Sequence, residues 1–560
     1  MGPSRHAGPP RAAPPASHGR GPLTTPAEAP PPRPSLARST GVMVVGTALS
    51  RITGFGRVFA MAYAFGFVRT RLTDTYNLAN TTPNIIYDLI LGGVLSATLL
   101  PVFVHRLSTD DEDGAWRSIS AVVTVVMVFL VGVTILFAAL APWIVRAYTL
   151  GNHSADAGDQ RAVATYLLFL FAPQVFFYGV VTLTTAILHA RRRFAMPMFA
   201  PIFNNLIIIV VLLSVPHVAR SLDLNVIRHD HRALLLLGLG TTAGVIAMAA
   251  VQVPALRGAR ARLRPVWAPR DELVRIVLRL SGWTFGFSIL NQIALWVALV
   301  LANRHTGDLS AYQAAYSYFF LLPYGIFAVS LMSALQPDLS ERWALADIAG
   351  YRERLSVGIR TIAAVIIPAS VGYIVLARPI VKLLLQHGRF TAHDTHTTAA
   401  VLAVMATGLP AFSIFLLLMR AYQSMQDTRT VFWLYLVENA ANVVLALALY
   451  PSMGVNGLAL SFALAYGAGT VAAFFDLRRR IGGVDGRRVT RAVARIAVAS
   501  TAMAAATLLV SRAVGGTEGL HLLARVGLSV AAGLGVYAVA AVVLRMDEIT
   551  TLLPIRRRAS

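Results

Sequence analysis

Long apolar stretches, separated by short polar segments, recur along most of this chain. A helix needs about 20 apolar residues to cross a membrane, and stretches of that length predict about 14 spans. They lie near residues 41–66, 80–104, 118–145, 162–188, 197–216, 234–255, 274–302, 310–335, 356–377, 397–419, 430–450, 455–475, 492–511 and 522–544. The pattern therefore predicts an all-α polytopic membrane protein with mostly short loops.

Basic residues alternate with these spans. If the N-terminal segment is placed inside, the inside segments hold roughly 30 arginines and the outside loops roughly 13 Arg or Lys, which is the asymmetry of the positive-inside rule. Clear inside clusters lie at 191–193, 478–480 and 556–558. An even number of spans then predicts a multi-pass protein of the cytoplasmic membrane with both termini in the cytoplasm.

Landmarks in the first half of the chain recur at the same spacing in the second half. Pro101 closes the second span and Pro337 the eighth, and the turn near Arg191 has its counterpart near Asp427, both at an offset of about 236 residues. Internal repeats of this kind are typical of transporters. We expect two six-helix lobes related by pseudo-two-fold symmetry, with two extra C-terminal helices.

Domain boundaries follow from the spans. We expect an N-lobe at 39–256, a C-lobe at 257–478 and the last two helices at 479–548. The Pro/Ala/Arg-rich segment 1–38 and the segment 549–560 are expected to be cytoplasmic tails, the first of them disordered. The last two spans consist almost entirely of apolar residues. They could form a surface that faces membrane lipid or a lipid tail, and ordinary packing between helices explains them equally well.

Composition narrows the class of protein. The chain is 56% hydrophobic and 13% charged, whereas soluble domains carry about 25% charged residues. Its net charge of +23 would suggest nucleic acid in a soluble protein. Here the charge lies between spans, so we expect contacts with membrane lipids and no nucleic acid. Without cysteine, and without an HExxH, P-loop or GxSxG motif, we expect no enzyme and no cofactor.

Two arginines stand inside the first predicted span, in the segment Ser50-Arg51-Ile52-Thr53-Gly54-Phe55-Gly56-Arg57. A bare guanidinium near the bilayer centre costs a few kcal/mol. On a helix Arg51 and Arg57 differ in direction by roughly 120°, yet both can border a wide cavity. One interpretation is that they bind a phosphate-bearing substrate; the other is that one of them snorkels to an interface.

Other polar residues lie inside later spans. Asn84 and Asp88 share a helix face, and Asp88 is either a counter-ion for the arginines or part of a substrate or proton site. Glu438 and Asn442 share a face in the eleventh span, and Asn291 lies in the seventh. A carboxylate with amide oxygens suits a Na⁺ site or a proton relay. Interhelical hydrogen bonding explains these residues equally well, and no metal site is firmly assigned.

Several segments, taken in order and spacing, carry a family resemblance. The most telling is Ser50–Arg57, and the segments QHGRFT and QDTRT are also fairly specific. They lie at residues 50–57, 73–74, 83–86, 193–201, 386–391 and 422–430. Together they resemble the MurJ (MviN) lipid II flippase family of the multidrug/oligosaccharidyl-lipid/polysaccharide exporter superfamily, over roughly residues 40–545.

The resemblance implies a function. The substrate would be lipid II, the undecaprenyl-pyrophosphate-linked precursor of peptidoglycan, flipped from the inner to the outer leaflet by alternating access. A cationic central cavity would take the headgroup, and helices 13 and 14 would form a groove for the lipid tail. The expected substrate-binding residues are Ser50, Arg51, Arg57, Asp74, Asn84, Tyr87, Asp88 and Tyr318.

The chain departs from proteobacterial members of the family at two places. They follow the Pro-Asn motif with paired arginines, where this chain has Tyr87-Asp88, a form that looks like the actinobacterial branch. They also carry an arginine in helix 8, where this chain has Tyr318 or a neighbour. The cavity is therefore expected to be less basic here.

Energy supply and competing functions stay open at this point. The membrane potential, worth about 2.3 kcal/mol per charge per 100 mV, or a Na⁺ or H⁺ gradient are the candidates for resetting the carrier. Asn291, Glu438 and Asn442 are the candidate coupling residues. The alternatives are an exporter of another polyprenyl-pyrophosphate-linked glycan, and a non-transporting membrane scaffold for cell-wall synthesis proteins.

Overall fold

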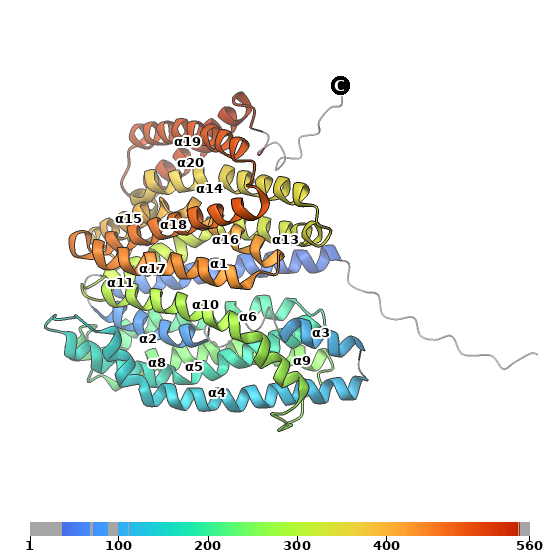
Figure 1. The fold of residues 1–560 in the computed structure, drawn as a ribbon. Coiled ribbons are helices and arrows are strands. Elements are labelled where there is room, and N and C mark those ends of the chain that lie inside the picture. Colours follow the sequence, from blue (N-terminus) through green and yellow to red (C-terminus); the bar gives the residue numbers. More distant parts are fainter. Residues whose placement is uncertain (1–35, 68–70, 88–98, 110, 547, 549–560) are drawn as a thin grey trace, which may run out of the picture.

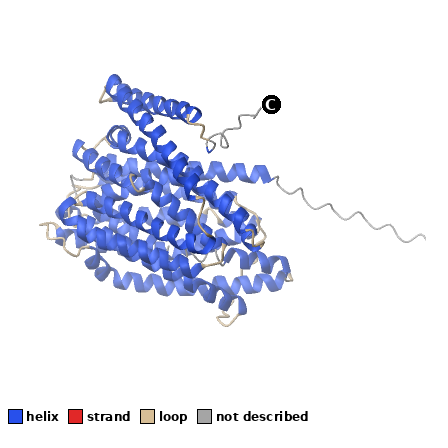
Figure 2. Ribbon diagram, turned by 45° about the horizontal axis from the view of Figure 1, so that its top comes forward, coloured by secondary structure: helices blue, strands red, loops and turns tan. Residues whose placement is uncertain are grey.

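The structure is a computed structural model that describes residues 36–67, 71–87, 99–109, 111–546 and 548. All regular structure in these ranges is helical, as expected (Figure 2). The helices, with η for π-helical turns, are α1 (Leu36–Phe65), α2 (Leu72–Tyr87), α3 (Leu100–Thr109), α4 (Glu112–Tyr148), α5 (Ala157–Ala190), α6 (Ala195–Val218), α7 (Leu224–Ile227), α8 (His231–Ala250), α9 (Val253–Gly258), α10 (Glu272–Ala302), α11 (Asp308–Ala314), η3 (Ala315–Phe320), α12 (Leu321–Pro323), η4 (Tyr324–Ala328), α13 (Val329–Ala344), α14 (Ile348–Leu385), α15 (Ala392–Ala406), α16 (Leu409–Ser424), α17 (Thr428–Met453), α18 (Val455–Ile481), α19 (Gly486–Val514) and α20 (Gly519–Val543). The expected tails at 1–38 and 549–560 lie almost wholly outside the described residues.

The helices form two stacked bundles (Figure 1). The N-lobe contains α2 to α9, and the C-lobe contains α11 to α18. α1 packs on α6 of the N-lobe, and α10 contacts both α4 and α17, so α1 and α10 run where the two lobes meet. α19 and α20 pack on each other and on the outer side of α14. This arrangement confirms the expected two lobes with two additional C-terminal helices.

Ten described helices are long and apolar enough to cross a membrane, or eleven if the bent pair α15 and α16 counts as one span. The chain is therefore a multi-pass membrane protein. The predicted spans at 41–66, 80–104 and 274–302 do not reach this threshold in the described residues. The count of 14 therefore stays a prediction, as do the domain boundaries.

The tenth predicted span, 397–419, is broken in the middle. α15 and α16 meet at an angle of 48° across Thr407 and Gly408. Pro410 stands in the first turn of α16, where its missing N–H costs nothing. A Cβ on Gly408 would lie 2.5 Å from the Cα of Ala463, so the break also lets α18 approach closely. Hydropathy alone gives no sign of such a break.

The eighth span is continuous but irregular. Two π-helical turns, η3 and η4, flank Pro323 within the stretch Asp308–Ala344. Proline lacks the N–H that an α-helix needs at this position, and π turns are frequent at functional sites. The irregularity re-aims the side chains of Tyr318 and Tyr324 relative to a regular helix.

The two lobes are joined along α2 and α11, with a regular offset in sequence. Ser310 Oγ donates to Asp74 Oδ1 at 2.5 Å, across 236 residues. Asn77 Nδ2 donates to Ser310 Oγ at 3.1 Å across 233 residues, and Gln313 Nε2 donates to Thr81 Oγ1 at 3.1 Å across 232. These separations match the offset of about 236 seen in the sequence. Helices at equivalent positions of the repeat therefore face each other across the pseudo-two-fold axis.

One end of the molecule is closed by contacts between the lobes. We call it the sealed end; it comprises residues 63–67, 71–77, 303–310 and 386–391. The opposite end holds the basic segments 191–193, 257–270 and 478–491, and we call it the arginine-rich end. Hydrogen bonds between the lobes lie along α2 and at the sealed end. At the arginine-rich end, Arg106 forms an ion pair with Glu272, where α10 begins.

Candidate functional site

α1 turns one face toward the C-terminal half of the chain. Residues on this face recur every four positions, as on one side of a helix. The contacts pair Arg51 with Gly325, Phe55 with Phe319, Phe59 with His387, and Tyr63 with Arg389. The opposite side packs on α6, where a Cβ on Gly46 would lie 2.9 Å from Cβ of Met198. α1 therefore presents Arg51 to the C-lobe.

Arg51 is exposed and lies against η4. A Cβ on Gly325 would lie 3.6 Å from Nη2 of Arg51, so the absence of a side chain at Gly325 leaves room for the guanidinium. No carboxylate of the described residues lies within ion-pair distance of Arg51. Within the part of the chain that the structure describes, no ion pair neutralises its charge.

Arg57 is half-buried and points in another direction. It lies within electrostatic range of the hydroxyls of Tyr76 on α2, Tyr178 on α5 and Tyr318 on η3. Like Arg51, it forms no ion pair with a described carboxylate. The two arginines thus diverge as the helical wheel predicts, and both still reach the irregular eighth span, one at Gly325 and the other near Tyr318.

The predicted polar residues of α2 line the neighbourhood of Arg57. Asn84 donates from Nδ2 to the carbonyl of Asn80 at 2.9 Å. The ring of Tyr87 packs on that of Tyr178 with centroids 5.2 Å apart. Because Tyr178 also lies near Arg57, the structure brings Tyr87, Tyr318 and Arg57 around one tyrosine-rich region. Asp88 lies outside the described residues.

Ser50 contributes its backbone to the seam between α1 and α6. Its carbonyl accepts hydrogen bonds from Asn205 Nδ2 at 3.3 Å and from Thr53 Oγ1 at 3.1 Å. Asn205 also donates to Thr53 Oγ1 at 3.1 Å. These bonds fix the rotation of α1 on α6 and so the directions of its arginines.

Asp74 lies at the sealed end, with both carboxylate oxygens engaged. The backbone N–H of Gly307 donates to Oδ2 at 2.6 Å, and the N–H of Ser310 donates to Oδ1 at 3.0 Å. The carboxylate therefore caps the N-terminus of α11, where it satisfies backbone donors and complements the helix dipole. In this state its partners belong to the C-lobe, and neither Arg51 nor Arg57 is among them.

Arg71 is a buried residue of the sealed end that sequence reasoning missed. Its guanidinium donates to Thr306 Oγ1 at 3.1 Å and to the carbonyls of Asn303 at 3.2 Å and Arg304 at 3.3 Å. Its Nε lies 3.4 Å from Asp156. Arg71 joins two loops of different lobes, and its partners lie too far along the chain for any local pattern to reveal them.

The candidate coupling residues lie on α17 of the C-lobe and on the neighbouring α10. Asn291 Oδ1 accepts from Asn439 Nδ2 at 3.3 Å, and Asn442 Oδ1 accepts from Ser461 Oγ at 3.2 Å. Glu438 is buried, and its Oε2 has no hydrogen-bond partner among the described residues. The described residues contain no group of three His, Cys, Asp or Glu placed to hold a metal ion.

Arg420 on α16 is a further cation that the sequence did not single out. It is exposed and lies within electrostatic range of Tyr324 and Tyr435. Since Tyr324 precedes Gly325, η4 has Arg51 of α1 and Arg420 of α16 as neighbours. The only sequence signal was one arginine at the end of the apolar run of α16.

Known proteins resemble this chain over most of its length. The family described as "Lipid II flippase MurJ" matches residues 61–527. The chain belongs to the MurJ family. A probable lipid II flippase MurJ of Thermotoga maritima is 26% identical over 93% of this chain and 99% of its own length. The Rhizobium meliloti protein of the same description is 26% identical over 84% and 86%, respectively.

Solved structures agree with this family assignment at the level of the fold. "Lipid II flippase MurJ, inward closed conformation" superposes with a TM-score of 0.73 at 21% identity, covering 91% of this chain and 99% of that one. An inward-facing MATE transporter of the MOP superfamily superposes with a TM-score of 0.64 at 12% identity, covering 79% and 98%. The resemblance to MurJ seen in the motifs is thus confirmed, and the MATE transporter has a similar fold.

Proposed function

We propose that this protein flips lipid II from the inner to the outer leaflet of the cytoplasmic membrane for peptidoglycan synthesis. It is a transporter and not an enzyme. The observation that carries the proposal is the pair Arg51 and Arg57, which stand inside the first predicted span of a MurJ-family chain and have no ion-pair partner among the described carboxylates. Cations held in this way need an anion, and the pyrophosphate of lipid II supplies one.

The headgroup would bind where α1 meets the eighth span. Arginine forms paired hydrogen bonds to phosphate oxygens, so Arg51 and Arg57 would each hold part of the pyrophosphate. Tyr87, Tyr318 and Asn84 would supply neutral polar contacts around it, and Ser50 would keep α1 in register on α6. We add Arg420 to this set, because it approaches η4 from the C-lobe.

The distribution of charge indicates how the protein is oriented in the membrane. The positive-inside rule assigns the arginine-rich end and both termini to the cytoplasm. The sealed end then faces outward, so the lobes are joined on the outer side in this state. Flipping requires them to separate there, which would break the bonds of Arg71 and Asp74 to the C-lobe.

Two further parts of the chain would support this cycle. α19 and α20 expose large apolar side chains such as Leu509, Leu534 and Val539, which suits contact with membrane lipid and with the polyprenyl tail. Asn291, Glu438 and Asn442 are the candidates for binding Na⁺ or H⁺ in the C-lobe, and the membrane potential is the other candidate source of energy.

Depletion of the protein in its own cells tests the proposal. We expect lipid II to accumulate and to disappear from the outer leaflet, measured by labelling at the cell surface, and wild-type protein to restore it. Normal surface lipid II with accumulation of another lipid-linked glycan would contradict the choice of substrate. Restoration by the double variant Arg51→Ala/Arg57→Ala would contradict the site.

A further inference from the structure

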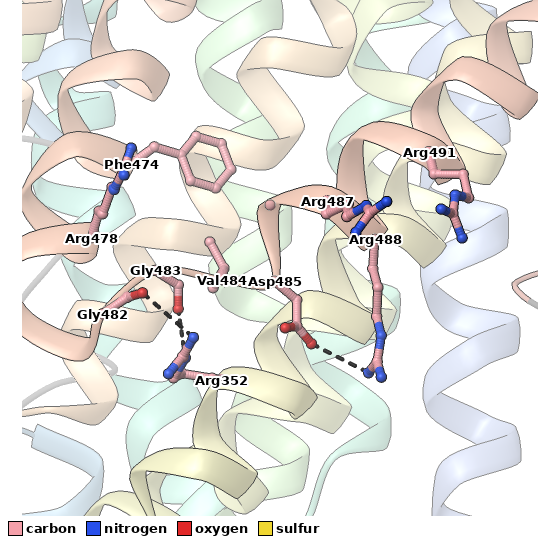
Figure 3. Close-up of a pocket in the computed structure, with 11 residues that line it drawn as sticks. Arg352, Phe474, Arg478, Gly482, Gly483, Val484, Asp485, Arg487, Arg488 and Arg491 are labelled. Carbon is pink, nitrogen blue, oxygen red and sulfur yellow. Dashed lines mark hydrogen bonds and ion pairs between the residues drawn. The ribbon is translucent and has the colours of Figure 1, made fainter.

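A basic pocket lies at the arginine-rich end, between the start of α14 and the turn that joins α18 to α19 (Figure 3). Its volume is about 850 Å³. Its lining includes one carboxylate, that of Asp485, and five arginines. These are Arg352, Arg478, Arg487, Arg488 and Arg491. The pocket therefore carries a strong excess of positive charge.

Arg352 is held in place by the turn between α18 and α19. Its Nε donates to the carbonyl of Gly483 at 2.8 Å, and its Nη2 donates to the carbonyl of Gly482 at 3.4 Å (Figure 3). Both glycines have positive φ, +75° and +97°, a conformation that glycine adopts without strain. These bonds orient the guanidinium. Among the described residues, no hydrogen bond uses the Nη1 donors of Arg352, so they can bind another acceptor.

The described carboxylates neutralise little of the pocket's charge. Asp485 lies 3.4 Å from Arg488. No described carboxylate lies within ion-pair distance of Arg478, Arg487 or Arg491. The neighbours of Arg478 differ: Arg479 stacks on the ring of Phe475 and Arg480 pairs with two aspartates. Of these three consecutive arginines, Arg478 alone lines the pocket.

The pocket combines this charge with apolar surface at the level of the membrane boundary. α18 ends and α19 begins here, and both are candidate membrane spans. Phe474 lies one turn before Arg478 and also lines the pocket. On α19 the face of Arg487 and Arg491 continues to Val498, which is 60% exposed. A ligand of this site would combine a phosphate with hydrocarbon chains.

We propose that this pocket binds the phosphate headgroup of an anionic phospholipid of the same leaflet, whose acyl chains lie along α19. Basic pockets between transmembrane helices on the cytoplasmic side are suited to such headgroups. The apolar lining favours a lipid over a soluble phosphate compound. The pocket shares no residue with the region of Arg51 and Arg57, and the inference does not depend on the proposed flipping.

Lipid binding to the purified full-length protein tests this site. Native mass spectrometry in neutral detergent measures the apparent Kd for phosphatidylglycerol and for zwitterionic phosphatidylcholine. We expect a clear preference for phosphatidylglycerol, and a roughly 30-fold loss of it in Arg487→Ala/Arg491→Ala, since each arginine near a membrane surface contributes about one kcal/mol. Arg487→Lys/Arg491→Lys keeps the charge and should keep most of the preference.

The matched control is Arg257→Ala/Arg270→Ala, which removes the same charge from exposed positions at the same end. It should bind phosphatidylglycerol within about twofold of wild type, because its arginines lie outside the pocket. An equal loss in this control, or equal binding of the two lipids by wild type, would overturn the proposal. Displacement of phosphatidylglycerol by an equal concentration of glycerol 3-phosphate would instead assign the pocket to a soluble anion and also overturn it.

Discussion

At the scale of single residues, the site depends on where two guanidinium groups point. Arg51 meets Gly325 of η4, and Arg57 lies among tyrosines of α2, α5 and η3. Their directions follow from the packing of α1 on α6, which Asn205 fixes by bonds to Ser50 and Thr53. The α1 helix therefore packs on the N-lobe through α6 and also carries the two arginines of the candidate site.

Removing either arginine should impair transport. A hydrogen bond to a charged group is worth about 1.5–3 kcal/mol, so Arg51→Ala or Arg57→Ala should weaken headgroup binding roughly 10- to 150-fold. Growth of a flippase-depleted strain carrying each variant measures the effect, with Arg270→Ala as a control of equal charge. Full growth with both variants would remove these residues from the site.

Arg420 offers a second test at this scale. If it approaches the same headgroup from the C-lobe, Arg420→Ala should reduce transport while Arg420→Lys retains most of it, because the charge is preserved. Arg479→Ala, which alters an exposed arginine stacked on Phe475, should leave transport unchanged. Equal activity of Arg420→Ala and wild type would restrict the site to α1.

The sequence revealed only part of this residue-scale picture. Arg51 and Arg57 could be found because charge inside an apolar stretch is conspicuous. The bonds of Asp74 to Ser310 could not be predicted, because the partners are 236 residues apart. The motif match drew attention to Asp74 as a substrate residue, whereas the structure shows it capping α11 in the present state.

At the scale of elements, two irregular spans and one tight loop shape the C-lobe and its contacts with α1. Hydropathy predicted the tenth span as one helix, because a 48° bend at Gly408 leaves the average apolarity unchanged. It also missed the π turns around Pro323, which change side-chain direction without changing composition. The length of the apolar stretches thus gave the location of most spans, whereas their breaks became visible only in the structure.

The loop at Gly388 provides a test of the sealed end. Gly388 has φ of +60°, and a Cβ there would lie 2.5 Å from the carbonyl oxygen of Tyr63. Gly388→Ala should therefore push the loop away from α1 and lower the thermal unfolding midpoint more than Gly482→Ala does. Gly482 has φ of +75° but meets only ordinary contacts, so this control isolates the backbone cost of about 1–2 kcal/mol. Equal midpoints would show that the loop does not pack tightly on α1.

At the scale of the whole molecule, alternating access requires the two lobes to separate at the sealed end. The chain has no cysteine, which permits engineered pairs without a background of native thiols. Thr81 and Gln313 join the lobes through a hydrogen bond of 3.1 Å. Thr53 and Asn205 form a bond of the same length and the same chemistry within the N-terminal half.

Cross-linking these two pairs separates motion between lobes from motion within one. With a short bis-thiosulfonate reagent, Thr81→Cys/Gln313→Cys should lose transport and regain it on reduction. Thr53→Cys/Asn205→Cys should stay active after cross-linking, because α1 and α6 move together. Transport that persists through the cross-lobe link would contradict a cycle in which the two lobes separate between α2 and α11.

The most direct measurement of the central claim uses the purified protein in lipid vesicles. Lipid II is placed in both leaflets, the outer pool is labelled or cleaved, and the rate at which the protected pool becomes accessible is followed, with a membrane potential or a Na⁺ or H⁺ gradient imposed in turn. The account predicts that wild-type protein accelerates this exchange under at least one of these conditions, and that Arg51→Ala/Arg57→Ala does not. A rate equal to that of protein-free vesicles under every condition would contradict it.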